Sequence, residues 1–124
     1  MHGSSSVPQD WLAIINQYGG AIPETYGVPL EQIQEGIRHG VRKVNIDTDL
    51  RLASTGAIRR FLAQKPAEFD PRKYLAETIV AMRDICIERY EAFGTAGNAS
   101  KIKVKSLAAM QQAYDAGQLN QRVT

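Results

Sequence analysis

Apolar residues recur at helical spacing in several segments of the chain, separated by short stretches rich in glycine, proline and serine. This i, i+3, i+4 repeat is typical of amphipathic helices that bury one face. Glycine or proline at the ends of the segments predicts where the helices stop. The predicted helices cover residues 9–18, 29–39, 48–64, 71–93 and 106–117. The tail from Gln118 is expected to be frayed.

Local capping signals support these boundaries. Asp70 followed by Pro71 is a helix cap followed by proline at the first helical position, and Pro29 suits the same position of its helix. Asp47 or Thr48 can cap the helix that follows, and Ser106 can cap the last one. The predicted helix 71–93 carries a continuous apolar stripe of Leu75, Ile79, Met82, Cys86, Tyr90 and Phe93.

Residues 41–47 form the only segment with good strand alternation. Val44 and Ile46 alternate with polar residues, so Asn45 and Asp47 are expected on the opposite side. A single strand has no neighbour for its backbone donors and acceptors, which is costly when they are buried. We therefore interpret the chain as part of a larger α/β protein, although a helical domain with one extended connector is also possible.

Composition limits the class of protein. The chain has 124 residues, enough for one domain, with 44% hydrophobic residues and a net charge of +2. This balance, without interleaved aromatics in the basic stretches, favours neither a nucleic-acid nor a membrane partner, and no apolar run approaches the roughly 20 residues of a membrane span. A single cysteine, Cys86, excludes an internal disulfide framework and fits a cytoplasmic protein.

The N-terminal segment His2-Gly3-Ser4-Ser5-Ser6 is the first candidate site. It offers one imidazole that could bind a metal, followed by a flexible backbone whose N–H groups can face an anion. One histidine cannot hold a zinc ion by itself. From the residues alone, a flexible terminus is the favoured interpretation.

A second candidate is Asn45-Ile46-Asp47-Thr48-Asp49, which places polar residues where a strand ends and a helix begins. Ligands of α/β folds bind at this position, and N–H groups at a helix start favour phosphate. A helix cap with a solvated acidic edge explains the segment equally well. Arg72 lies in the first turn of a helix, where the macrodipole disfavours a cation. It is either an anion ligand or, more simply, an exposed arginine.

Taken together, these segments resemble one known family. The chain is similar to the C-terminal third of a class II fructose-1,6-bisphosphate aldolase, of the type found with the Calvin cycle in autotrophic bacteria. The resemblance covers essentially the whole chain and rests on His2–Ser6, Glu24–Gly27, Gly40–Asp49, Phe69–Tyr74 and Phe93–Lys101, in that order.

The resemblance implies a (β/α)8 TIM barrel, of which residues 1–124 would be the C-terminal portion of a single domain. The end of strand seven would lie at His2 and strand eight at Val41 to Ile46. Enzymes of this family reversibly cleave fructose 1,6-bisphosphate into dihydroxyacetone phosphate and glyceraldehyde 3-phosphate. A zinc ion held by three histidines polarises the ketone and stabilises the enediolate.

The resemblance also assigns roles to individual positions. His2 matches a zinc ligand, and Asn45 matches the residue that hydrogen-bonds the dihydroxyacetone part. Arg72 matches an arginine that reaches the second phosphate from a neighbouring subunit, which implies a homo-oligomer. The remaining substrate-binding positions are Gly3, Ser4 and Ser5 in a phosphate-binding loop, and Ile46, Asp47 and Thr48 beside it.

Other parts of the family's site have no match in this sequence. The other two zinc histidines, the catalytic aspartate and a mobile glutamate loop lie outside it, so we expect no catalytic residue here and no activity from this chain alone. A tagatose-bisphosphate aldolase of the same fold is an alternative. A non-catalytic interaction or scaffold protein is another.

Overall fold

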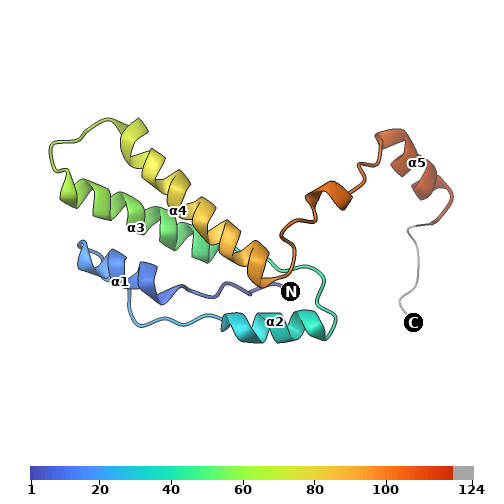
Figure 1. The fold of residues 1–124 in the computed structure, drawn as a ribbon, viewed down its shortest axis with the longest axis horizontal. Helices are drawn as coiled ribbons and strands as arrows, with labels where there is room; N and C mark the ends of the chain where they lie inside the picture. The colour runs from blue at the N-terminus through green and yellow to red at the C-terminus, as the bar shows by residue number, and fades with distance from the viewer. Residues whose placement is uncertain (119–124) are drawn as a thin grey trace.

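The computed structural model describes residues 1–118 and is helical (Figure 1). The predicted helices are all present, with ends that differ from the prediction by a few residues at most. They are α1 (Gln9–Gln17), α2 (Leu30–Arg38), α3 (Thr48–Gln64), α4 (Pro71–Ala92) and α5 (Leu107–Asp115), with a 3₁₀ turn, η1 (Ala99–Lys101), between the last two.

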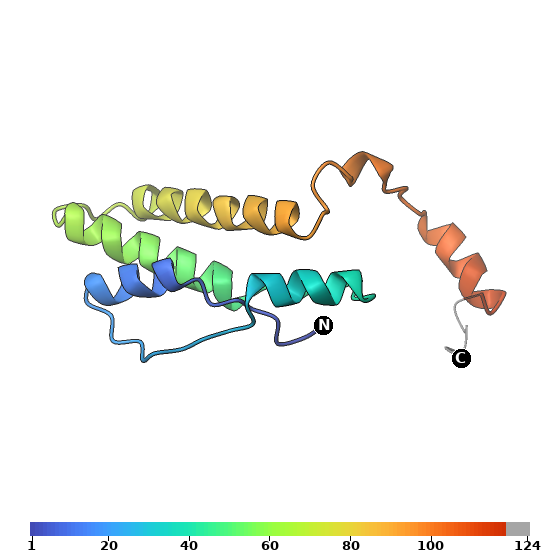
Figure 2. The same ribbon diagram turned by 60° about the horizontal axis from the view of Figure 1, so that its bottom comes forward.

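The centre of the fold is a hairpin of α3 and α4 (Figures 1 and 2). The two helices approach through small side chains, since Ala53 and Ala57 of α3 form one buried cluster with Ala81 and Ile85 of α4. The Asp70–Pro71 start of α4 is confirmed, because the Asp70 carboxylate accepts a hydrogen bond from the Arg72 N–H at 3.0 Å. The hairpin therefore follows from the local cap at Asp70 and from the small alanine side chains where the two helices meet.

Helix α1 also packs on α3. The ring of Trp11 lies against Gly56, where an added Cβ would be 2.7 Å from a ring carbon. The guanidinium of Arg60 lies 5.5 Å from the centre of the same ring, a cation–π distance. Gly56 is therefore the position that lets α1 approach α3.

The predicted strand at residues 41–47 is not formed in the described residues, which contain no strand, and this segment is an extended connector. A strand needs a ladder on at least one side, and only the residues around Met1 lie beside it. The predicted alternation of sides is nevertheless visible. Val44 and Ile46 line an apolar cavity of about 420 Å³, whereas Asn45 contacts His2.

The predicted apolar stripe of α4 is only partly correct. Ile79 is 68% exposed and Tyr90 is 60% exposed, and Leu75 is also largely exposed. The buried face of α4 consists instead of Thr78, Ala81, Ile85 and Arg89. The reason is the packing on α3, which follows the face of Ala81 and Ile85 and leaves Ile79 and Tyr90 turned outward. Among the described helices none has the length and apolar character to cross a membrane.

Helix α5 stands apart from the rest of the described chain (Figures 1 and 2). The predicted Ser106 cap is confirmed by a bond from the Ala109 N–H to the Ser106 hydroxyl at 3.2 Å. No residue of α5 is buried. The frayed tail expected from Gln118 falls on residues 119–124, which lie outside the described residues.

We expect Gly56→Ala to lower the free energy of unfolding by about 1 kcal/mol or more, because the new methyl group overlaps the ring of Trp11 and the overlap outweighs the gain in helix propensity. Gly36→Ala, in α2, is the matched control, since its Cβ would be 3.4 Å from Val41. Denaturant unfolding measures both. Equal stability of the two variants would contradict the tight Trp11–Gly56 contact.

Candidate functional site

The N-terminal residues lie alongside the connector that precedes α3. The Met1 ammonium donates to the Lys43 carbonyl at 2.6 Å, and the Asn45 N–H donates to the Met1 carbonyl at 3.2 Å. These bonds flank Val44 in the slanted pattern of a parallel strand pair. The hydroxyl of Ser4, which is fully buried, donates to the Asn45 carbonyl at 2.7 Å. Two segments about forty residues apart are thereby joined.

This pairing brings together His2 and Asn45, two positions singled out from the sequence. The imidazole Nδ1 of His2 lies 2.7 Å from the side-chain nitrogen of Asn45. His2 is exposed and Asn45 is half-buried. The imidazole and the amide are therefore adjacent at the surface, where a ligand could contact both.

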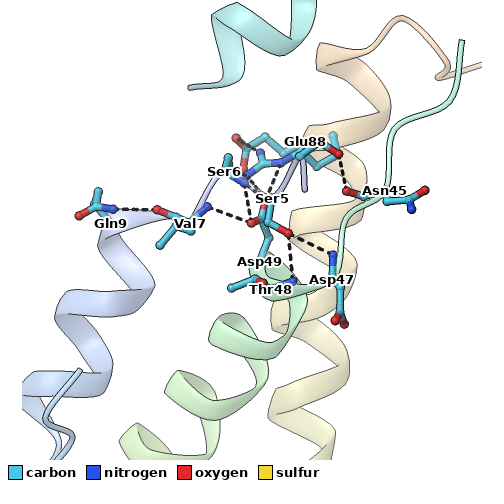
Figure 3. A network of polar contacts seen from close by, with 11 residues as sticks. Ser5, Ser6, Val7, Gln9, Asn45, Asp47, Thr48, Asp49 and Glu88 are labelled. Atoms are coloured by element: carbon cyan, nitrogen blue, oxygen red, sulfur yellow. Dashed lines mark hydrogen bonds and ion pairs between the residues drawn. The ribbon is translucent and has the colours of Figure 1, made fainter. Parts of the chain in front are cut away.

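Ser5 lies at the start of α3 (Figure 3). Its hydroxyl oxygen accepts from the Thr48 N–H at 3.2 Å and, more weakly, from the Asp47 N–H at 3.5 Å. Asp47 occupies the cap position but makes no side-chain cap bond, and its carboxylate instead pairs with Arg51 at 2.9 Å. The predicted cap residue is thus replaced by a serine from a distant part of the chain.

Asp49 lies in the first turn of α3 and is fully buried. Its carboxylate accepts from the N–H groups of Ser6 at 2.9 Å and Val7 at 3.0 Å, and from the Ser6 hydroxyl at 2.8 Å (Figure 3). It also pairs with Arg89 of α4 at 3.1 Å. The interpretation of Asp47 to Asp49 as a solvated acidic edge is therefore wrong for Asp49, although Asp47 is exposed.

The loop before α2 supports Ser5 from the other side. The Val28 N–H donates to the Ser5 carbonyl at 3.1 Å. A Cβ at Gly27 would be 2.2 Å from that carbonyl oxygen, so only glycine allows this approach. Ser5 is consequently held between the 21–28 loop and the start of α3.

Gly3 and Ile46, two further predicted site positions, differ in their surroundings. Gly3 has a φ of +65° and open space around its Cα, which fits a loop that approaches a ligand closely. The side chain of Ile46 lines the apolar cavity with Leu50 and Ile85, away from His2. Any contact of Ile46 with a ligand would have to come from its backbone.

Arg72 does not join this site within the chain. It lies at the opposite end of α4 from Arg89, about 25 Å away along the helix axis. Its side chain is 89% exposed and bonds Asp70 at 2.6 Å. That ion pair and the Arg72 N–H hold the pKa of the Asp70 carboxyl below its usual range.

The residues of the described part do not form a zinc site by themselves, because no three histidine, cysteine, aspartate or glutamate side chains come together there. His2 supplies a single imidazole. A structural or catalytic zinc ion takes at least three protein ligands, so further ligands would have to come from outside residues 1–118.

Sequence reasoning placed Ser6 and Asp49 inside the candidate segments but gave them no supporting role, and it missed the buried Arg89. One signal could have indicated Arg89, because it continues the i, i+4 series of Ala81 and Ile85. A charge on the face of a helix that carries small apolar residues requires a buried partner of opposite sign. The identity of that partner was not readable from spacing.

Comparison with known proteins identifies the family. The family described as fructose-bisphosphate aldolase class II matches residues 1–98. The chain is 77% identical over 123 residues to a fructose-bisphosphate aldolase of Pseudomonas aeruginosa, covering 99% of this chain and 35% of the relative. It is 66% identical over 120 residues to one from Nostoc commune, covering 97% and 33%.

These matches place the chain in an enzyme family that acts on sugar phosphates. The chain belongs to the class II fructose-bisphosphate aldolases, a family of lyases whose members have a TIM barrel and generally depend on zinc. This confirms the resemblance seen in the sequence. The chain spans about one third of the length of the relatives it matches.

We expect Arg72→Ala to raise the pKa of the Asp70 carboxyl toward its ordinary value of 3.8, because the main cause of its depression is removed. A lowered pKa means that Asp70 stabilises the folded state above its unfolded pKa and loses that effect as the pH falls through the folded pKa. The variant should therefore lose less stability than the wild type on acidification, because the Asp70 carboxylate contributes less to the folded state above its unfolded pKa. Carboxyl NMR, assigned with Asp70→Asn, measures the shift. An unchanged Asp70 pKa would contradict the ion pair.

Proposed function

We propose that the complete protein containing this chain reversibly cleaves fructose 1,6-bisphosphate to dihydroxyacetone phosphate and glyceraldehyde 3-phosphate. The observation that supports this most directly is the placement of His2 and Asn45 side by side, next to the Ser5-capped start of α3. A metal-binding imidazole, an amide and an anion-binding helix start are then adjacent. These are the groups that a phosphorylated ketone requires.

One phosphate of the substrate binds at the start of α3 in this proposal. The N–H groups of Asp47 and Thr48 and the hydroxyl of Ser5 converge there. Gly3 and Ser4 bring the backbone of the loop close, and the helix macrodipole adds a favourable charge. An oxygen of the phosphate would take the place that the Ser5 hydroxyl now occupies.

Asn45 and His2 act on the other end of the same triose unit. The Asn45 amide can donate to the hydroxyl or carbonyl oxygen of the dihydroxyacetone part, and its backbone is fixed by the Ser4 hydroxyl. His2 is proposed as one zinc ligand, with the others outside this chain. Zinc, when bound, supplies Lewis-acid chemistry at the ketone.

We further propose that residues 1–124 are the C-terminal portion of a (β/α)8 barrel. The parallel hydrogen-bond pattern between Met1 and the residues around Val44 supports strands seven and eight side by side. The large side chains exposed on α4 fit a helix that lacks part of its surroundings. On this basis the isolated chain has no aldolase activity, and the free Cys86 fits a cytoplasmic enzyme.

Arg72 is proposed to bind the second phosphate of a neighbouring subunit in a homo-oligomer. Its distance from the His2 site excludes a role at that site within one chain, and its guanidinium is exposed. Asp70 holds the side chain in place through three side-chain hydrogen bonds. The two triose phosphates and the bisphosphate are the substrates this arrangement serves.

In the complete enzyme, we expect His2→Ala to abolish cleavage at ordinary zinc concentrations, because a three-histidine site that loses one ligand loses both affinity and geometry. His39→Ala is the matched control, since the His39 side chain is exposed at the C-terminal end of α2, where it pairs with Glu35. The measurement is aldol cleavage together with zinc content. Normal turnover and zinc content in His2→Ala would refute the assignment, and cleavage by the isolated chain would refute the fragment proposal.

Arg72→Ala should raise KM and lower kcat/KM for the bisphosphate about ten- to a hundredfold, the value of a charged hydrogen bond to phosphate. Binding of dihydroxyacetone phosphate alone should change less. Arg83→Ala, an exposed arginine of the same helix that pairs with Asp84, is the control. Equal losses for both ligands would place Arg72 at the other phosphate or give it only a structural role.

A further inference from the structure

The carboxylate of Asp49 makes more contacts than a helix start needs, and none of them is with solvent. Oδ1 accepts from the N–H groups of Ser6 and Val7. Oδ2 accepts from the Ser6 hydroxyl and from Arg89. Asp49 is 0% exposed, so it cannot touch a substrate. Its role must therefore be exercised through the residues that it holds.

These residues form the loop in which the proposed phosphate ligands lie. Val7 has a φ of +55°, a left-handed conformation that is unfavourable for a β-branched side chain. The Asp49 bonds to two successive N–H groups hold this conformation. Ser5 immediately precedes them, so the direction of the Ser5 hydroxyl depends on the turn that Asp49 fixes.

Arg89, near the C-terminal end of α4, stabilises the same arrangement of Asp49 and the loop. Its Nη2 atom donates both to Asp49 at 3.1 Å and to the Ser6 hydroxyl at 2.7 Å, and the residue is 7% exposed. The same guanidinium donates to Glu88 through Nη1 at 2.7 Å. The buried guanidinium of Arg89 thus links α4 to both Asp49 and Ser6.

We propose that Asp49 and Arg89 are positioning residues that hold residues 4–7 in the shape required to bind a phosphate group. This inference rests on the proposed function for the identity of the ligand. It goes beyond that function because neither side chain lies in the ligand-binding surface. The pair acts through the loop backbone and the Ser6 hydroxyl.

Asp49→Asn in the complete enzyme is the direct test. Asparagine keeps the shape and one acceptor oxygen, but it removes the charge and places an amide donor where Arg89 or the loop N–H groups require an acceptor. We expect KM for the bisphosphate and the inhibition constant for inorganic phosphate to rise about tenfold, with a smaller loss of kcat. Asp84→Asn, an exposed aspartate on α4, is the control.

A purely structural role would lower the amount of folded enzyme, and hence apparent kcat, without changing KM. Amide hydrogen exchange over residues 4–7 gives a second readout that does not depend on turnover. Asp49→Asn should speed this exchange, and Asp84→Asn should not. If the wild-type enzyme fails to cleave the bisphosphate, the proposed function fails, but hydrogen exchange and phosphate binding still decide the positioning role.

Arg89→Lys covers the case in which Asp49→Asn does not fold. Lysine keeps the positive charge, but its single ammonium cannot reproduce the forked contacts to Asp49, Ser6 and Glu88. A smaller rise in KM and faster exchange of residues 4–7 are expected. Wild-type KM, phosphate affinity and exchange in the folded variants would overturn the proposal.

Discussion

The buried ion pair between Asp49 and Arg89 is the interaction on which the rest of the described structure depends. It joins the N-terminal loop, the start of α3 and the end of α4, which are distant in sequence. A buried pair of this kind costs desolvation energy, and removing one partner typically destabilises a protein by about 3–5 kcal/mol. Its value lies in specificity, because a carboxylate with this many donors accepts only one arrangement of the loop.

The ion pair also explains why the hairpin and the site cannot be separated. The face of α4 that packs on the alanines of α3 ends at Arg89, so the register between the two helices decides where the guanidinium lies. A shift of one turn would move it by about 5.4 Å and leave Asp49 without a partner. Close packing of small residues is therefore part of the support for the loop.

The sequence predicted those features that depend on local signals. The Asp70–Pro71 and Ser106 starts and the glycine ends are set by a few neighbouring residues, and they were found at or near the expected positions. The strand at 41–47 and the large apolar stripe of α4 were not, because both depend on partners elsewhere in space. A strand requires a ladder, and a stripe requires a surface to cover it.

The residues of the candidate site also fall into two groups, those that the sequence identified and those that it did not. His2, Ser5 and Asn45 were identified through the family resemblance, and the structure places His2 against Asn45 and Ser5 against Thr48. Asp49 and Arg89 were not assigned, because their importance comes from burial and mutual contact rather than from a short motif. The replacement of Asp47 by Ser5 as the cap of α3 was likewise unreadable, since the two residues are far apart along the chain.

The Ser5 hydroxyl has one more consequence, for the selectivity of the site. Without a ligand, the N–H groups of Thr48 and Asp47 already have an acceptor. An incoming group therefore gains only the difference between its own hydrogen bonds and those of a neutral hydroxyl. For water or a sugar hydroxyl this difference is close to zero, whereas bonds to a charged group are worth about twice as much as neutral ones. At the proposed phosphate site, the serine would thus act as a competing acceptor that favours a phosphate dianion over water or a sugar hydroxyl.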